Sequence, residues 1–424
     1  MAESANLPIP TTASAPDSSS AWAPLGEPLF RSLWIAAVIS YTGTWMQNVG
    51  AGWLMTDLTT SPLMVSLVQA AATLPVFLVI LPAGALADIV DRRRLLLITQ
   101  GWMVLASAAL GIMTLTSCIG PWTVLLFTFL LGLGAVMNDP AWQAITPEIV
   151  SPRQHASAVA LNSVGFNVAR AIGPALGGLV VAGFGSGTAF LLNAVSFFGV
   201  IFFLYHWKRP QDLYAMPKAR VLPSILEGVK HARDTSVVRA VLIRTGTFSI
   251  GASSLLALLP LLAHPHGPSG YGLLLGSFGL GALAGAAVLP NLKRRLSVDG
   301  VVAFAILVFA AMVLAAGQAE NFGVLCGVMF VAGTAWIAIL ACLNVAAQTM
   351  SPPHYRARAL SCYLLVLQGG MALGSAVWGT LATRLSVPTS LALASLALVV
   401  GMIAIPRHRL DASHLALAPS VVRD

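Results

Sequence analysis

One arginine lies deep inside a long apolar stretch of this 424-residue chain. Arg170 comes about 14 residues into the apolar run 156–183, which is roughly 21 Å along a helix and near the middle of a membrane. A charge at that depth costs at least about 2.5 kcal/mol, so its presence indicates a role. We predict that Arg170 binds an anionic or hydrogen-bond-accepting molecule, or holds a neighbouring helix in one of two states. The alternative is a structural pairing with helix carbonyls or an amide.

Other polar and indole side chains also fall within the apolar runs. Amides and indoles there can donate hydrogen bonds to a bound molecule while their helices remain in the membrane. From polarity and depth we predict that they line one cavity with Arg170. They are Trp34, Trp45, Gln47, Asn48, Gln69, Asn344 and Gln368.

The composition predicts an all-α membrane protein. Hydrophobic residues make up 57% and charged residues 9%, with a mean hydropathy of +0.83, whereas a soluble domain carries about a quarter charged residues. The net charge of +8 does not indicate nucleic acid, because the basic residues lie between apolar runs. The cysteines lack metal spacing and a paired pattern, so we expect no metal, cofactor or disulfide, and small core residues instead. They are Cys118, Cys326, Cys342 and Cys362.

Runs of about 20 apolar residues predict membrane-spanning helices. An even count places both termini on the same side, and the Lys and Arg residues identify that side as the cytoplasm, since only Arg170, Arg244 and Arg384 fall elsewhere. Twelve spans are expected, at 30–55, 62–86, 95–116, 120–139, 156–183, 187–207, 237–262, 269–290, 300–317, 321–346, 357–383 and 387–406.

The polar segments divide the chain into five parts. The first, rich in Ala, Ser and Pro, has the composition of a disordered tail. Apolar residues at helical spacing in Leu222–Ile243 predict a helix on the inner membrane surface, although a simple tether is equally compatible. The expected parts are a tail at 1–28, a six-helix bundle at 29–207, a linker at 208–236, a second bundle at 237–406 and a tail at 407–424.

The two halves repeat one another at an offset of about 200 residues. The sequence GALAD at Gly84 recurs as GALAG at Gly281, and a basic cluster follows each. A second match relates SPRQ at Ser151 to PPHY at Pro352, and glycines follow both. Two parallel-repeat bundles are therefore predicted, as in secondary transporters.

The loop that follows the second span resembles a known signature. Gly84, Asp88, Arg92 and Arg93 match positions of the motif Gly-x-x-x-Asp-Arg-x-Gly-Arg-Arg of the major facilitator superfamily, while Ile89 and Asp91 depart from it. These departures, and the phrase from Gly43 to Pro75, resemble the branch that contains the enterobactin exporter and the transmembrane secretion effectors. The resemblance implies that Gly84 and Asp88 form part of a cytoplasmic gate. The arginines alone are also explained as an orientation signal.

The fifth span resembles the helix 5 signature of drug–proton antiporters. Pro174 removes a helix hydrogen bond and permits a bend, and the glycines beside it allow close approach of another helix. We predict a hinge here, although ordinary small-residue packing gives the same pattern. The residues are Gly173, Pro174, Gly177 and Gly178.

The resemblance implies an exporter of a small amphipathic molecule, such as a drug, siderophore or secreted metabolite, that works by alternating access and proton antiport. A proton-coupled cycle needs a titrating group, and the carboxylates nearest to the spans are Asp57 and Asp139, at opposite rims. Transport without protons is the alternative, and a lipid or lysolipid translocator is another.

No nucleophile–base set or metal cluster suggests an enzyme, so no catalytic residues are predicted. We expect a monomer in the plasma membrane that crosses it many times, with a small molecule and membrane lipid as its partners.

Overall fold

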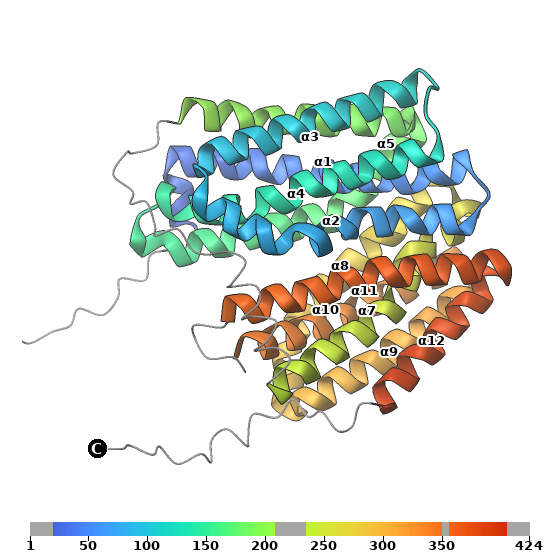
Figure 1. The fold of residues 1–424 in the computed structure, drawn as a ribbon. Coiled ribbons are helices and arrows are strands. Elements are labelled where there is room, and N and C mark those ends of the chain that lie inside the picture. Colours follow the sequence, from blue (N-terminus) through green and yellow to red (C-terminus); the bar gives the residue numbers. More distant parts are fainter. Residues whose placement is uncertain (1–19, 208–234, 350–355, 405–424) are drawn as a thin grey trace, which may run out of the picture.

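The computed structural model describes residues 20–207, 235–349 and 356–404, without the side chains of 81–89, 236–237, 357 and 403–404. All regular structure in these residues is helical (Figure 1), which confirms the predicted all-α class. The α-helices are α1 (Pro28–Leu58), α2 (Pro62–Ile89), α3 (Arg92–Leu115), α4 (Pro121–Ile149), α5 (His155–His206), α7 (Ser236–Ala263), α8 (Gly267–Arg295), α9 (Val298–Gln318), α10 (Phe322–Thr349), α11 (Arg356–Arg384) and α12 (Val387–Ala404). The 3₁₀ helices are η1 (Ala23–Gly26), η2 (Pro152–Gln154) and η3 (His264–His266).

Local residues explain where several helices begin. Pro28 and Pro121 stand in the first turns of α1 and α4, where the missing N–H of proline costs no hydrogen bond. Asp91 caps α3 because its Oδ1 accepts from the backbone N–H of Arg94 at 2.8 Å. Ser297 caps α9 in the same way through the N–H of Gly300.

Eight stretches of the described residues are long and apolar enough to cross a membrane. Two of them, Pro152–His206 with 55 residues and Val238–Arg295 with 58, are each long enough to cross twice. Within α5 the backbone reverses at Gly185, where φ is +81°, a left-handed value that favours glycine. The outer surfaces are apolar, as lipid contact requires: the side chains of Leu105 and Phe184 are 71% and 73% exposed.

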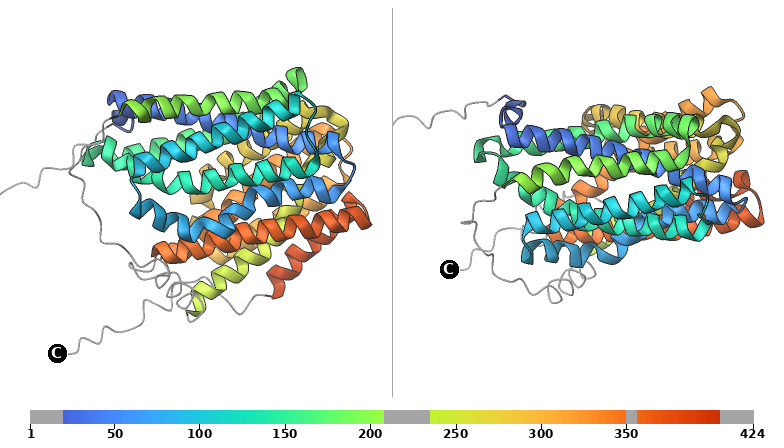
Figure 2. Two further views of the ribbon diagram at one scale, coloured as in Figure 1. Left: turned by 45° about the horizontal axis from the view of Figure 1, so that its top comes forward. Right: turned by 90° about the horizontal axis from the view of Figure 1, so that it is seen from above.

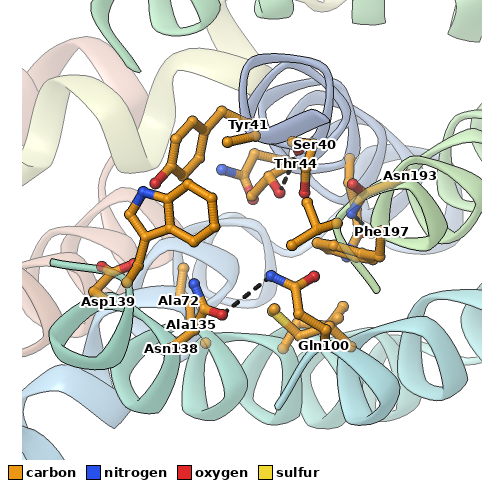
Figure 3. Close-up of a pocket in the computed structure, with 18 of the residues that line it drawn as sticks. Ser40, Tyr41, Thr44, Ala72, Gln100, Ala135, Asn138, Asp139, Asn193 and Phe197 are labelled. Carbon is orange, nitrogen blue, oxygen red and sulfur yellow. Dashed lines mark hydrogen bonds between the residues drawn. The ribbon is translucent and has the colours of Figure 1, made fainter. Parts of the chain in front are cut away.

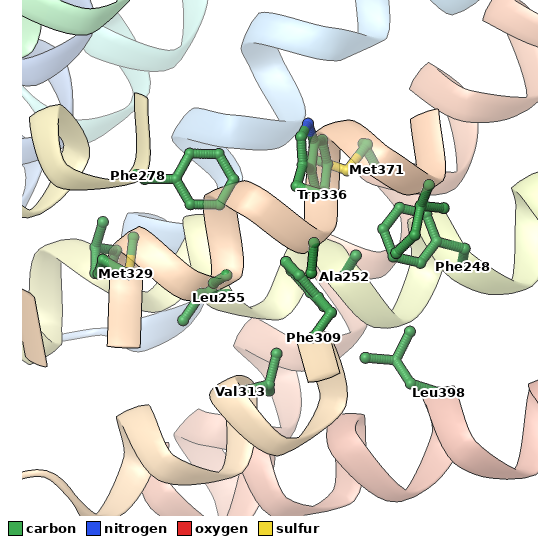
Figure 4. Close-up of a cluster of buried hydrophobic side chains, with 14 of the residues drawn as sticks. Phe248, Ala252, Leu255, Phe278, Phe309, Val313, Met329, Trp336, Met371 and Leu398 are labelled. Carbon is green, nitrogen blue, oxygen red and sulfur yellow. The ribbon is translucent and has the colours of Figure 1, made fainter. Parts of the chain in front are cut away.

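The helices form two groups that lie side by side, α1–α5 and α7–α12 (Figures 1 and 2). One continuous apolar core holds α7–α12 together and includes Phe248, Phe309 and Trp336 (Figure 4). Smaller clusters hold α1–α5, one of them around Leu96 and Ile145. Helices α2 and α5 pack against α11 and α8, so the two groups meet along two helix pairs.

Several predicted boundaries differ from the structure. The span expected at 120–139 continues as α4 to Ile149, because Pro140 and Pro147 are accommodated inside the helix rather than ending it. The tail expected at 1–28 contains η1, whose Pro24 is buried. The span expected at 237–262 corresponds to α7, and Val238, at the overlap with the expected surface helix, is buried in α7 at 1% exposure. The rest of the linker prediction at 208–236 falls mostly outside the described residues.

Candidate functional site

A cavity of about 340 Å³, the central cavity, lies between the two helix groups. Helices α1, α2, α4 and α5 form one wall, and α7, α8, α10 and α11 form the other. Five of the eight residues predicted to line a binding cavity lie here. They are Trp45, Asn48, Gln69, Arg170 and Gln368.

The two walls of the central cavity differ in chemistry. Among the polar side chains, most belong to the wall of α1–α5: Asn48, Gln69, Thr73, Thr128 and Arg170. The opposite wall is mostly apolar and aromatic, with Leu256, Tyr271, Leu275, Phe278, Trp336 and Met371 beside Gln368. The cavity is therefore suited to a molecule with one polar and one apolar side.

The aromatic wall is fixed by the core behind it (Figure 4). The ring of Trp336 packs on Phe278, Phe248 and Phe309 with centroid separations of 5.9, 5.5 and 5.9 Å. Such offset and edge-on contacts stabilise aromatic clusters beyond simple burial. Trp336 is thus held rigidly where it lines the cavity.

Arg170 is partly buried at the polar wall. Its Cζ lies 5.9 Å from the ring centroid of Trp45, within the range of a cation–π contact. It forms no ion pair or hydrogen bond with any residue that the structure describes, so its five N–H donors remain available. The carbonyl of Arg170 also lies beside Gly279 of α8, where an added Cβ would meet it at 3.0 Å.

Three residues predicted for the same cavity lie elsewhere. Trp34 donates from Nε1 to the carbonyl of Leu161 at 2.9 Å, so it joins α1 to α5. Asn344 accepts from Gln348 within α10. Gln47 turns into the α1–α5 group, where its Oε1 accepts from Ser107, at 2.6 Å, and from Asn193.

A second cavity, the bundle pocket, has a volume of about 220 Å³ and is lined only by residues of α1–α5 (Figure 3). Gln100 and Asn138 face each other in it, and Gln100 Nε2 donates to Asn138 Oδ1 at 3.0 Å. Thr99 donates to the same oxygen at 3.4 Å. The pocket shares Asn48, Ala51, Ala72 and Thr128 with the central cavity.

A third space, the vestibule, lies where α4 ends and α5 begins and has a volume of about 560 Å³. It shares Tyr41, Asp139, Trp142 and Phe166 with the bundle pocket. The three spaces therefore adjoin one another in series.

The two candidate proton carriers occupy different surroundings. Asp139 was expected at a membrane rim, but it lies ten residues before the end of α4 and faces both the bundle pocket and the vestibule. Asp57 is exposed at the end of α1. Asp139 thus faces two spaces inside or beside the α1–α5 group, whereas Asp57 lies at an end of that group.

The predicted hinge glycines make close helix contacts. A Cβ on Gly173 would lie 2.6 Å from Trp45 Cβ, and one on Gly177 would lie 2.7 Å from Met46 Cα, so both bring α5 against α1. Gly178 lies against α8 instead. Pro174 lines the central cavity inside an unbroken helical segment. Whether this segment bends in a cycle stays a prediction.

The arginines of the signature loop bind within their own helix group. Arg92 forms an ion pair with Glu148 of α4 at 2.8 Å. Arg93 donates to the carbonyls of Leu204 and Tyr205 at 2.7 and 2.6 Å. It thus supplies hydrogen bonds to two carbonyl groups in the last turn of α5. Gly84 and Asp88 belong to α2, but their side chains lie outside the described residues.

Cross-group contacts gather at the end that carries the α1–α2 connection. The N–H of Leu63 donates to Thr383 Oγ1 at 3.1 Å, which joins α2 to α11. The ring of Trp53 in α1 stacks on His264 of η3, with centroids 5.7 Å apart. The two groups therefore meet at this end.

The described side chains that could bind a metal ion or form a disulfide do not cluster. Among the described residues, no group of three His, Cys, Asp or Glu could hold a metal ion. All four cysteines are free. Cys342 and Cys362 are buried, but Cys118, which was expected in the core, is exposed after α3 ends.

Sequence reasoning missed most of the bundle pocket and the aromatic wall. Gln100 and Asn138 were not predicted, although an amide inside an apolar run is the same signal that singled out Gln69. Tyr41 was not predicted either. Trp336 and Tyr271 carry no such signal, because aromatic residues are common in membrane helices.

Solved transporter structures share this fold. A mutant form of the nucleoside transporter NupG superposes with a TM-score of 0.74 at 13% identity, covering 89% of this chain and 98% of that one. A bacterial homologue of the lysosomal transporter Spinster, inward-facing and occupied, superposes with a TM-score of 0.68 at 13% identity, covering 90% and 95%. At this identity the likeness shows the fold alone.

Relatives in sequence include exporters. The multidrug efflux pump Tap of Mycolicibacterium fortuitum is 26% identical over 91% of this chain and 97% of its own length. The enterobactin exporter EntS of Salmonella choleraesuis is 25% identical over 88% and 90%. The staphyloferrin A transporter of Staphylococcus aureus is 25% identical over 61% of this chain and 66% of its own length. A sequence profile described as transmembrane secretion effector matches residues 19–422. The chain therefore belongs to the transmembrane secretion effector family of the major facilitator superfamily, whose members are multi-pass membrane transporters.

Proposed function

We propose that this protein exports a small amphipathic molecule from the cytoplasm by alternating access. The observation that carries the proposal is the central cavity. One wall holds amides and Arg170, which has no ion pair among the described residues, and the other holds the rigid Trp336 cluster. A molecule with an acidic or hydrogen-bond-accepting edge and an aromatic body matches both walls. The relatives' names mention drugs and enterobactin, and small exported molecules of this kind are the proposed substrates.

The proposed topology has twelve spans in two bundles of six, with both termini in the cytoplasm. The break at Gly185 supports it, because it lets α5 supply two spans without a long connection. The positions of Arg92–Arg94, Arg153 and Lys293–Arg295 at one end of the helices agree with the positive-inside rule. The protein is proposed to act as a monomer in the plasma membrane.

We assign proton coupling to Asp139 rather than Asp57. A coupling carboxylate must be reachable from water while it communicates with the substrate route. Asp139 meets this requirement, since it faces the vestibule and the bundle pocket, and the pocket adjoins the central cavity. Gly84 and Asp88 are proposed to gate the cytoplasmic end, as the family signature implies.

Direct transport tests the proposal. A strain lacking the gene is grown with a panel of toxic compounds and under iron limitation, and each compound that distinguishes it from the wild type is then followed in proteoliposomes. We expect movement of that compound to require the protein and a pH gradient. Equal movement in protein-free liposomes would contradict export, and movement insensitive to the gradient would contradict proton coupling.

Alternating access also requires the contact between α2 and α11 to break during each cycle. With the native cysteines replaced, Leu63→Cys and Thr383→Cys introduce thiols at the hydrogen-bonded positions. Joining them with a short thiol-specific cross-linker is expected to reduce transport by at least about tenfold, and reduction of the cross-link is expected to restore it. Each single variant, treated identically, is the control. Full transport by the cross-linked protein would show that this contact does not open.

A further inference from the structure

The bundle pocket contains polar groups that no protein atom satisfies. Trp142 Nε1, Gln100 Oε1 and Thr128 Oγ1 are buried without a hydrogen-bond partner among the described residues. The three residues are 8%, 4% and 8% exposed, so each is more than nine-tenths buried. All three line the pocket. Buried polar groups normally have partners, so a donor, an acceptor and a hydroxyl that can do both, at a single cavity, point to a bound molecule.

The only acidic side chain among the residues that line the bundle pocket is Asp139. Asp139 lines it with an exposed side chain and has no ion-pair partner among the described residues. No Lys or Arg is among the residues that line this pocket. The titratable side chains nearest to Asp139 around these spaces are Tyr41, from α1, and His155, at the start of α5. Arg92 is already held by Glu148.

Aromatic rings surround the carboxylate. Tyr41, Trp142 and Phe166 line the pocket and the vestibule together with Asp139. Tyr41 and Phe166 meet edge to face with centroids 5.3 Å apart, so their positions are fixed. Figure 3 places Tyr41 and Asp139 on the same side of the pocket. Rings beside a carboxylate bind organic cations through cation–π attraction and direct charge pairing.

The shape of the pocket suits an elongated molecule. Thr128 comes eleven residues before Asp139 on α4, which is roughly 16 Å along the helix at 1.5 Å per residue. Apolar side chains such as Met103, Leu131 and Phe197 line it as well. A ligand with its charge at Asp139 can therefore extend an apolar body along α4.

We propose that the bundle pocket is a second ligand site, separate from the central cavity, that binds a small protonated amine with an aromatic or aliphatic body. The ammonium group pairs with Asp139 among the rings, and Gln100 Oε1 accepts a hydrogen bond from the ligand. The vestibule is its entrance. Whether the amine is then exported depends on the proposed function, but its binding does not.

Equilibrium binding tests the site with a matched set of small molecules. The purified full-length protein in detergent at pH 7 is titrated with radiolabelled tyramine, and unlabelled tyramine, 4-ethylphenol and 4-hydroxyphenylacetate compete. These molecules share a phenol but are cationic, neutral and anionic respectively. We expect saturable tyramine binding that only unlabelled tyramine displaces well. Displacement by 4-ethylphenol or 4-hydroxyphenylacetate as strong as that by tyramine would overturn the proposal.

Variants test which side chains bind tyramine. Asp139→Asn is expected to weaken tyramine binding at least about tenfold, whereas Glu320→Gln, which removes an exposed charge beyond α9, leaves it unchanged. Tyr41→Leu removes a ring and weakens binding severalfold, while Tyr41→Phe keeps the ring and the affinity. Unchanged affinity in both Asp139→Asn and Tyr41→Leu would overturn the site.

The amine site and the proposed export function can be tested independently of each other. Arg170 lines the central cavity, so the Arg170→Ala protein is expected to retain tyramine binding in full. A loss of tyramine binding in Arg170→Ala equal to that in Asp139→Asn would show that the two spaces form one site, which would overturn the proposal. Absence of transport in liposomes together with normal tyramine binding would contradict only the export function.

Discussion

Replacing Arg170 by alanine is expected to weaken the apparent affinity of the exported molecule by roughly ten- to 150-fold. A hydrogen bond to a charged group contributes about 1.5 to 3 kcal/mol, and each 1.4 kcal/mol is a factor of ten. Arg170 has no partner among the described residues other than the ring of Trp45, so its donors are free for the ligand. The measurement is the substrate concentration dependence of transport in proteoliposomes.

Two further variants separate charge from geometry. Arg170→Lys keeps the charge but loses the planar fork of donors, so an intermediate affinity is expected. Arg384→Ala removes an exposed arginine at the end of α11 and is expected to leave transport unchanged. An Arg170→Ala protein that folds and transports with wild-type affinity would remove Arg170 from the substrate site and support the structural alternative.

Adding a single methyl group at Gly178 is expected to separate the two helix groups. A Cβ there would lie 2.7 Å from the carbonyl oxygen of Pro268 and 2.9 Å from Gly272 Cα, and both atoms belong to the backbone of α8. Backbone cannot move aside as a flexible side chain can, and overpacking costs about 1 to 3 kcal/mol. We expect Gly178→Ala to depopulate this conformation by roughly five- to 150-fold and to reduce transport by a similar order.

Gly183 provides the matched control on the same helix, since an added Cβ there meets nothing within 4 Å. Gly183→Ala is expected to transport normally. Spin labels on α5 and α8 report the separation of the two groups, and it should increase only in Gly178→Ala. Equal separations and equal transport in both variants would contradict the prediction, because they would show that the contact between α5 and α8 accommodates the added methyl group.

Much of the fold is predictable because the lipid environment imposes it. Backbone groups in a membrane must be satisfied within their own segment, so apolar runs of sufficient length become helices. The boundaries were less predictable where proline intervened. The dipeptide Asp139-Pro140 predicts the end of a span, but α4 continues to Ile149. Inside a helix group, neighbouring helices compensate for the missing N–H, and sequence alone does not report those neighbours.

The candidate site was predictable in part, for a physical reason. Depth in the membrane makes a polar side chain conspicuous, and this led to Arg170, Gln69 and Gln368. Depth does not show which of the neighbouring helices or cavities a side chain faces. Gln47 and Asn48 are adjacent in α1, yet Asn48 reaches the central cavity while Gln47 bonds to Ser107 and Asn193. Only the three-dimensional packing separates such neighbours.

The placement of the bundle pocket within α1–α5 alone has a thermodynamic consequence. If the two groups move as rigid bodies, the walls of the central cavity separate and approach, whereas those of the bundle pocket keep their distances. A ligand with equal affinity for two states shifts no population between them, however tightly it binds. An amine at Asp139 would therefore occupy inward- and outward-facing forms alike. It would slow the proton-coupled cycle by excluding protons from that carboxylate, without shifting the balance between the two forms.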